Sequence, residues 1–115
     1  MVRLPKLEVS KSALGIVNNV YEIERKISLH GDSANISRNV NRLKELIRDM
    51  GFVYEDPMGQ PFKETRTDLE ASISGTGTEN LRVTEVIKPI VREVGGLSMV
   101  VQKGIVVVEE KRTGD

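Results

Sequence analysis

Few side chains in this chain of 115 residues could carry out acid–base or nucleophilic chemistry. His30 is its one histidine, and it has no cysteine. A histidine can act as a general base near neutral pH, and a thiolate can attack a substrate or bind zinc. Without a second histidine or a cysteine, catalytic triads and most zinc sites lack the residues that they require. We interpret His30 as a helix-end residue, because its positive form suits the helix dipole there.

Carboxylates and glycines offer two further patterns, and neither predicts a reaction. The carboxylates form no spaced pair on a recognisable scaffold, and Glu109 and Glu110 are typical of a solvated strand end. Gly75 and Gly77 lack the helix and the lysine that follow the glycines of a phosphate-binding loop. We therefore expect a flexible linker at these glycines. We also expect that the protein is not an enzyme and needs no cofactor or metal ion.

The composition favours a small soluble protein. Lys and Arg number 17 together, as do Asp and Glu, so the formal net charge is zero and steers the chain to neither nucleic acid nor membranes. The N-terminal residues lack the apolar stretch of a secretory signal, and no apolar run reaches the ~18–20 residues of a membrane span. We expect a cytoplasmic protein with no membrane partner, and nucleic acid is not an expected partner either.

Two amphipathic helices are predicted in the first half of the chain. Apolar residues recur at three- and four-residue steps over 12–29 and again over 33–50. Ser33 is the predicted N-cap of the second helix, and Gly51 is its predicted stop. Neither helix can bury its stripe alone. The stripes consist of Ala13, Ile16, Val17, Val20, Ile23 and Ile27, and of Ile36, Val40, Leu43, Ile47 and Met50.

The second half of the chain is typical of a small β domain. Prolines and glycines predict a turn at 56–61, and a Gly- and Thr-rich segment predicts a loop at 74–78. Two β-rich stretches follow at 81–91 and 97–108, and the Gly95-Gly96 pair between them favours a hairpin. Pro89 cannot donate to a β ladder, so we expect it at an edge or a bulge. The predicted fold class is α+β, with a helical module at 1–51 and a mainly antiparallel β domain at 52–115.

Several segments follow one another in an order known from a protein family. They include the loop Asp56-Pro57-Met58-Gly59-Gln60-Pro61-Phe62, the tripeptide Leu69-Glu70-Ala71, and residues 14–24, 40–52, 83–89 and 105–108. Together these segments resemble the conserved part of the GrpE proteins, the nucleotide-exchange factors of DnaK-type chaperones. The family's loop reads aspartate, a gap, glycine, any residue, proline and phenylalanine. Its tripeptide usually reads histidine-glutamate-alanine.

The chain departs from the GrpE pattern at four places. GrpE proteins have a long helix before this region, whereas about a dozen residues precede it here. Leu69 replaces the histidine of the tripeptide. Gln102-Lys103-Gly104 stand where the family usually has arginine-proline-alanine, and Met99 aligns with an arginine of some members. The last two departures lie on the side of the hairpin that contacts the chaperone in the family.

The resemblance implies a homodimer in which each chain contributes its two helices to a four-helix bundle. The β domain then binds the nucleotide-binding domain of a DnaK-type chaperone and promotes ADP release by holding the cleft open. On this basis Ile87, Met99 and Val108 are the expected partner contacts. The expected dimer interface consists of Ile16, Val20, Ile23, Ile27, Ile36, Val40, Leu43 and Ile47.

Two alternatives compete with this interpretation. The first is a dimeric adaptor that has the GrpE-like fold but no exchange activity. The second is a winged-helix DNA-binding protein, in which residues 33–43 form the recognition helix and residues 50–54 begin the wing. The second alternative has no support from the zero net charge, and it leaves the β-rich C-terminal third unexplained.

Overall fold

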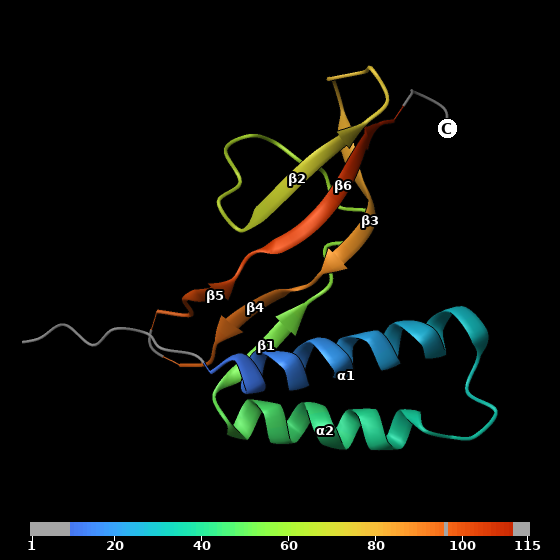
Figure 1. Cartoon of the computed structure of the whole chain (residues 1–115), viewed down its shortest axis with the longest axis vertical. Helices are drawn as coiled ribbons and strands as arrows, with labels where there is room; N and C mark the ends of the chain where they lie inside the picture. Colours follow the sequence, from blue (N-terminus) through green and yellow to red (C-terminus); the bar gives the residue numbers. More distant parts are fainter. Residues whose placement is uncertain (1–9, 96, 112–115) are drawn as a thin grey trace, which may run out of the picture.

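The computed structural model describes residues 10–95 and 97–111, and they form two helices and two small sheets. Figure 1 shows the helices side by side at one end of the molecule, with one sheet next to them and the other sheet farther away. The predicted α+β class is therefore confirmed. The elements are α1 (Lys11–His30), α2 (Ser37–Asp49), β1 (Phe52–Glu55), β2 (Leu69–Ser74), β3 (Leu81–Lys88), β4 (Ile90–Glu93), β5 (Val100–Gln102) and β6 (Gly104–Glu110).

The ends of both helices follow from local hydrogen bonding. The Ser10 side chain accepts from the Ala13 N–H at 3.0 Å and caps α1, which ends at His30 as predicted. Ser33 does not cap α2, so that prediction is wrong. The Asp32 carboxylate accepts instead from the Ile36 N–H at 2.7 Å and from the Ser37 N–H at 3.1 Å. A hydrogen bond from the Ser37 hydroxyl also lowers the pKa of Asp32.

Gly51 ends α2 in the predicted manner. Its φ angle is +99°, a conformation that glycine adopts without steric cost, and its N–H donates to the Arg48 carbonyl at 2.9 Å. The chain then enters β1, which pairs antiparallel with β4. The wing of a winged helix needs β1 to pair with the next strand along the chain, so the topology does not match the DNA-binding alternative.

The predicted hairpin exists, and it runs through both sheets. One sheet has the strand order β1-β4-β5 and the other β2-β6-β3. In the first sheet β4 pairs with β5, and in the second β3 pairs with β6, both antiparallel. Pro89 separates β3 from β4, which fits its expected place at an irregularity. Strand β2 was not predicted, and it pairs parallel with β6 from Leu69↔Gly104 to Ser74↔Glu109.

Two groups of buried residues form the core. One lies within the β2-β6-β3 sheet and reaches β4 and α1, with Tyr21, Leu69, Val83, Val86, Ile90, Val106 and Val108. The other joins the helices to the β1-β4-β5 sheet, with Val17, Val20, Val40, Ile47 and Val91. The predicted boundary after residue 51 falls between the end of α2 at Asp49 and the start of β1 at Phe52. The apolar core nevertheless continues across that boundary, so the helices pack directly on the strands.

Replacing Gly104 with alanine is expected to destabilise the fold by about 1–3 kcal/mol. A Cβ atom at this position would lie 2.8 Å from Leu69 Cδ2 and 3.0 Å from Ile90 Cγ1, and both of those side chains are buried. Urea unfolding followed by circular dichroism measures the loss. Gly15→Ala is the control, because a Cβ there meets nothing within 4 Å and alanine favours a helix. A Gly104→Ala variant as stable as the native chain would contradict this packing.

Candidate interaction surfaces

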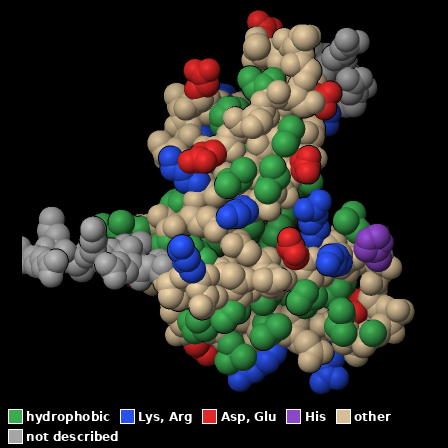
Figure 2. All heavy atoms as spheres, in the orientation of Figure 1, with side chains coloured by type: hydrophobic (Ala, Val, Ile, Leu, Met, Phe, Trp, Pro, Cys, Tyr) green, Lys and Arg blue, Asp and Glu red, His purple; other side chains and the backbone are tan. Residues whose placement is uncertain are grey.

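The outer surface of the helix pair carries exposed apolar side chains. Leu43 and Leu46 on α2, and Met50 directly after it, lie within an arc of about 60°, because each residue advances the helix by about 100°. All three are exposed, and Ile16 on α1 is 48% exposed. Figure 2 shows hydrophobic side chains gathered over the helices. We call this surface the apolar helix face, and it consists of Ile16, Ile23, Ile36, Leu43, Leu46 and Met50.

The predicted dimer interface divides between this surface and the core. Four of its residues are exposed, namely Ile16, Ile23, Ile36 and Leu43. Val20, Val40 and Ile47 are at most 4% exposed, because they pack against Val91 and its neighbours within the chain. Their assignment to an interface with a second chain is therefore wrong. Ile27 is half-buried at the edge of the same core.

The predicted partner contacts also divide. Ile87 on β3 is 54% exposed, and Met99 at the start of the β5 segment is 49% exposed. Both side chains are accessible to another protein. Val108 is fully buried between β3 and β2, so its assignment as a contact is wrong. Leu97, which sequence reasoning did not single out, is 90% exposed near Met99 in the turn between β4 and β5.

Two tyrosines attach α1 to the β1 segment. The Tyr21 hydroxyl donates to Asp56 Oδ1 at 3.2 Å, and the Tyr54 hydroxyl donates to Glu24 Oε1 at 3.0 Å. The rings meet edge to face with centroids 5.8 Å apart. Burial, with the nearby Asp56 charge, raises the pKa of Tyr21 to about 12. Burial, with the nearby Glu24 charge, also raises the pKa of Tyr54. Both hydroxyls therefore stay protonated and donate near neutral pH. These contacts hold α1 and the adjacent sheet together.

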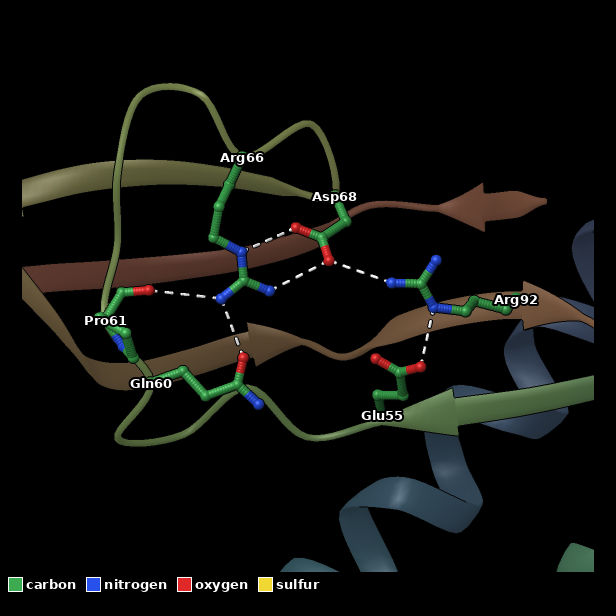
Figure 3. Close-up of polar contacts among 6 residues, drawn as sticks. All are labelled: Glu55, Gln60, Pro61, Arg66, Asp68 and Arg92. Atoms are coloured by element: carbon green, nitrogen blue, oxygen red, sulfur yellow. Dashed lines mark hydrogen bonds and ion pairs between the residues drawn. The ribbon is translucent and has the colours of Figure 1, made fainter. Parts of the chain in front are cut away.

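A charged network joins the two sheets on another side of the molecule (Figure 3). Asp68, just before β2, accepts from Arg66 at 2.9 and 3.0 Å and from Arg92 on β4 at 3.1 Å. Arg92 also donates to Glu55 on β1 at 2.8 Å. The hydrogen bonds from Arg66 hold the pKa of Asp68 below its usual range. Asp68 therefore connects the loop after β1, the start of β2 and the first sheet.

Comparison of the chain with protein-family models, with curated proteins and with solved structures gives no match. In the described part of the chain, no group of three or more His, Asp and Glu residues could hold a metal ion. No helix among residues 10–95 and 97–111 is both long and apolar enough to cross a membrane. Among the described residues, the apolar helix face and the exposed hairpin residues Ile87 and Met99 are the candidate interaction sites.

Replacing Asp68 with asparagine is expected to lower stability by about 1–3 kcal/mol at pH 7, because two arginines lose their charged acceptor. Its pKa is lower in the folded state than the unfolded value of about 3.9. The contribution of the carboxylate to stability is thus complete above about pH 5 and disappears as the pH falls through the folded pKa.

Thermal unfolding from pH 2 to pH 7 should show the stabilities of Asp68→Asn and the native chain converging in acid. Asp49→Asn, at the exposed end of α2, should change stability little at any pH. A constant difference between Asp68→Asn and the native chain would contradict this assignment.

Proposed function

We propose that this chain is a GrpE-like co-chaperone. In this proposal a homodimer binds the nucleotide-binding domain of a DnaK-type chaperone in the cytoplasm and promotes ADP release by holding the cleft open. The apolar helix face carries the proposal, because a single chain leaves it exposed to water. Exposed apolar side chains gathered on one part of a surface are typical of an interface. The resemblance of the sequence to GrpE proteins supplies the partner.

A second copy of the chain fits the apolar helix face better than a small ligand does. The face extends along two adjacent helices, and two such pairs can pack as a four-helix bundle around shared apolar positions. A twofold axis would place the face of one chain against the identical face of the other. The core of the single chain is thin, since it contains two tyrosines and two phenylalanines and otherwise aliphatic residues. Dimer formation would therefore also stabilise the fold.

Exchange by this mechanism depends on shape and contact area. A factor that binds the open form of a cleft more tightly than the closed form must weaken nucleotide binding by the same ratio. The factor therefore needs a rigid surface that remains in place when the chaperone closes. The tyrosine contacts between α1 and the β1 segment, and the Asp68 network between the sheets, supply such rigidity. Ile87 and Met99 supply accessible apolar contacts on the hairpin.

The test measures ADP release from a purified DnaK-type chaperone loaded with fluorescent ADP. We expect the chain to raise the release rate at least tenfold, with a GrpE protein as the positive control. Binding to the chaperone without faster release would favour the adaptor alternative. If neither binding nor faster release is seen, the proposal is wrong, and salt-sensitive binding to duplex DNA in the same experiment would favour a nucleic-acid function.

A further inference from the structure

Strand β1 is an outer strand of its sheet, and one of its edges is open. The strand order is β1-β4-β5, and Figure 1 shows β1 as the strand nearest the helices. Its register with β4 runs from Phe52 to Glu55 without a bulge. An outer strand presents unpaired N–H and C=O groups along its open edge, and these groups can pair with another extended chain.

The hydrogen bonds next to β1 show which of its backbone groups reach the open edge. The Val94 N–H donates to the Gly51 carbonyl at 2.8 Å, immediately before β1 begins. Hydrogen-bonded pairs alternate with non-hydrogen-bonded pairs along an antiparallel ladder. The backbone groups of Val53 therefore face β4, whereas those of Phe52 and Tyr54 face the open edge. In the described residues, no backbone group of a turn or loop bonds to them.

A pocket of about 210 Å³ lies between β1 and α2. Ile47, which lines it from α2, is 2% exposed, and the β1 residues that line it are partly buried. Sites for drug-sized ligands have volumes of about 300–1,000 Å³, so this pocket suits one side chain of a longer ligand better. We call it the β1–α2 groove, and it is lined by Lys44, Glu45, Ile47, Arg48, Phe52, Val53 and Tyr54.

The charges at the β1–α2 groove leave one arginine unbalanced. Lys44 Nζ lies 3.0 Å from Glu24 Oε2, and Arg42 Nη1 lies 3.0 Å from Glu45 Oε2. Arg48 is exposed and takes part in none of the ion pairs among the described residues. A positive charge beside an apolar pocket favours an acidic ligand, because complementary charges steer and orient binding.

We propose that the β1–α2 groove binds an extended acidic segment of another protein, which adds a strand to the open edge of β1. The backbone of the segment pairs with the free groups of Phe52 and Tyr54. One of its apolar side chains enters the pocket, and a neighbouring carboxylate pairs with Arg48. In this mode of recognition the backbone hydrogen bonds supply affinity, and the pocket and the charge supply specificity.

The groove remains open in the proposed dimer. Arg48 lies about 140° around α2 from Leu43, because each residue advances the helix by about 100°. A second chain on the apolar helix face therefore leaves the groove accessible. Residues 1–9 of the chain itself carry Arg3 and Lys6 against Glu8, so their charge does not suit Arg48. The proposal does not depend on a chaperone partner.

Fluorescence anisotropy with dye-labelled peptides tests the proposal. The probe consists of three Glu-Val repeats, and we expect saturable binding to the native chain. A peptide of three Lys-Val repeats should bind at least tenfold more weakly. A Glu-Val peptide that is N-methylated along its backbone should also lose at least tenfold, because it cannot donate hydrogen bonds to β1. Arg48→Glu should reverse the preference, so that the Lys-Val peptide binds more tightly than the Glu-Val peptide.

Arg38→Glu is the matched control, because Arg38 is an exposed arginine of the same helix that does not line the groove. It should leave the affinity for the Glu-Val peptide within twofold of the native value, and circular dichroism confirms folding of both variants. Absence of saturable binding overturns the proposal, as do equal affinities for the methylated and unmethylated peptides or equal losses in the two variants. Tighter binding of a peptide of residues 1–9 also overturns it and makes the chain's own segment the occupant. Each result is independent of the ADP-release experiment.

Discussion

Replacing Leu43 with aspartate is expected to separate the proposed dimer into folded monomers. Leu43 lies on the apolar helix face and is exposed in the single chain, so the substitution leaves the core of that chain intact. A charged group at the centre of a buried interface costs about 2 kcal/mol or more. A twofold axis places one substituted residue from each chain in the interface. The dimer therefore loses about 4 kcal/mol of binding free energy, and its dissociation constant rises about 1,000-fold.

Sedimentation velocity over a range of concentrations measures this effect. Asn39→Asp is the control, because it adds the same charge to an exposed polar position on the same helix. We expect the Asn39→Asp protein to remain a dimer at concentrations where the Leu43→Asp protein is monomeric. The helical signal in circular dichroism should be similar for both. If the native chain is monomeric at high concentration, or if Leu43→Asp leaves a dimer intact, the proposed dimer through the apolar helix face is wrong.

The features that the sequence predicted correctly are those with local signals. Apolar residues at helical spacing located both helices, and the glycine at position 51 located the end of the second. The Gly95-Gly96 pair and the β-branched runs on either side predicted the hairpin. Pro89 predicted an irregularity, because its missing N–H is a property of one residue. In each case the physical cause lies within a few residues of the feature.

Strand β2 and the Ser33 prediction show where local signals fail. Strand β2 has only Leu69, Ala71 and Ile73 as apolar residues, and its partner β6 lies about 35 residues further along the chain. A parallel pair of this kind is stabilised by contacts that form only in the folded sheet. Ser33 was the expected cap of α2, but the helix begins at Ser37. A turn in which the Asn35 N–H donates to the Asp32 carbonyl comes first, and it brings the Asp32 carboxylate to the Ile36 and Ser37 amides.

The candidate sites were only half predictable for a related reason. An apolar stripe on a helix shows that a residue needs an apolar neighbour, but it does not show whether that neighbour belongs to the same chain. Val20 and Ile16 belong to one stripe, yet the adjacent sheet covers Val20 and leaves Ile16 exposed. Val108 is buried because β6 is the central strand of its sheet, with neighbours on both edges. The β1–α2 groove has no sequence signal either, because the strand order of the folded sheet decides which strand edge stays open.

Replacing Met99 or Ile87 with aspartate is expected to weaken binding to the chaperone at least tenfold in each case. Both side chains are about half exposed on the hairpin, so neither substitution removes a core residue. An apolar anchor at a protein interface commonly contributes 2 kcal/mol or more, and 1.4 kcal/mol corresponds to a tenfold change in affinity. Calorimetric titration of the chaperone's nucleotide-binding domain with each variant measures the loss, and the rate of ADP release should fall in parallel.

Ile73→Asp is the matched control for these two variants. Ile73 is also about half exposed and apolar, but it lies on β2, where it pairs with Val108 near the end of β6 that is far from β5. Its substitution should leave chaperone affinity within twofold of the native value. Equal losses in all three variants would indicate a general effect of charge or folding, and no loss in either hairpin variant would place the contact elsewhere. Because Ile87 lies on β3 and Met99 in the turn before β5, and neither belongs to the helices that carry the apolar helix face, the variants should also remain dimeric. A monomeric Met99→Asp protein would show that the hairpin and the helices contribute to one interface, and it would contradict the separate roles proposed for them.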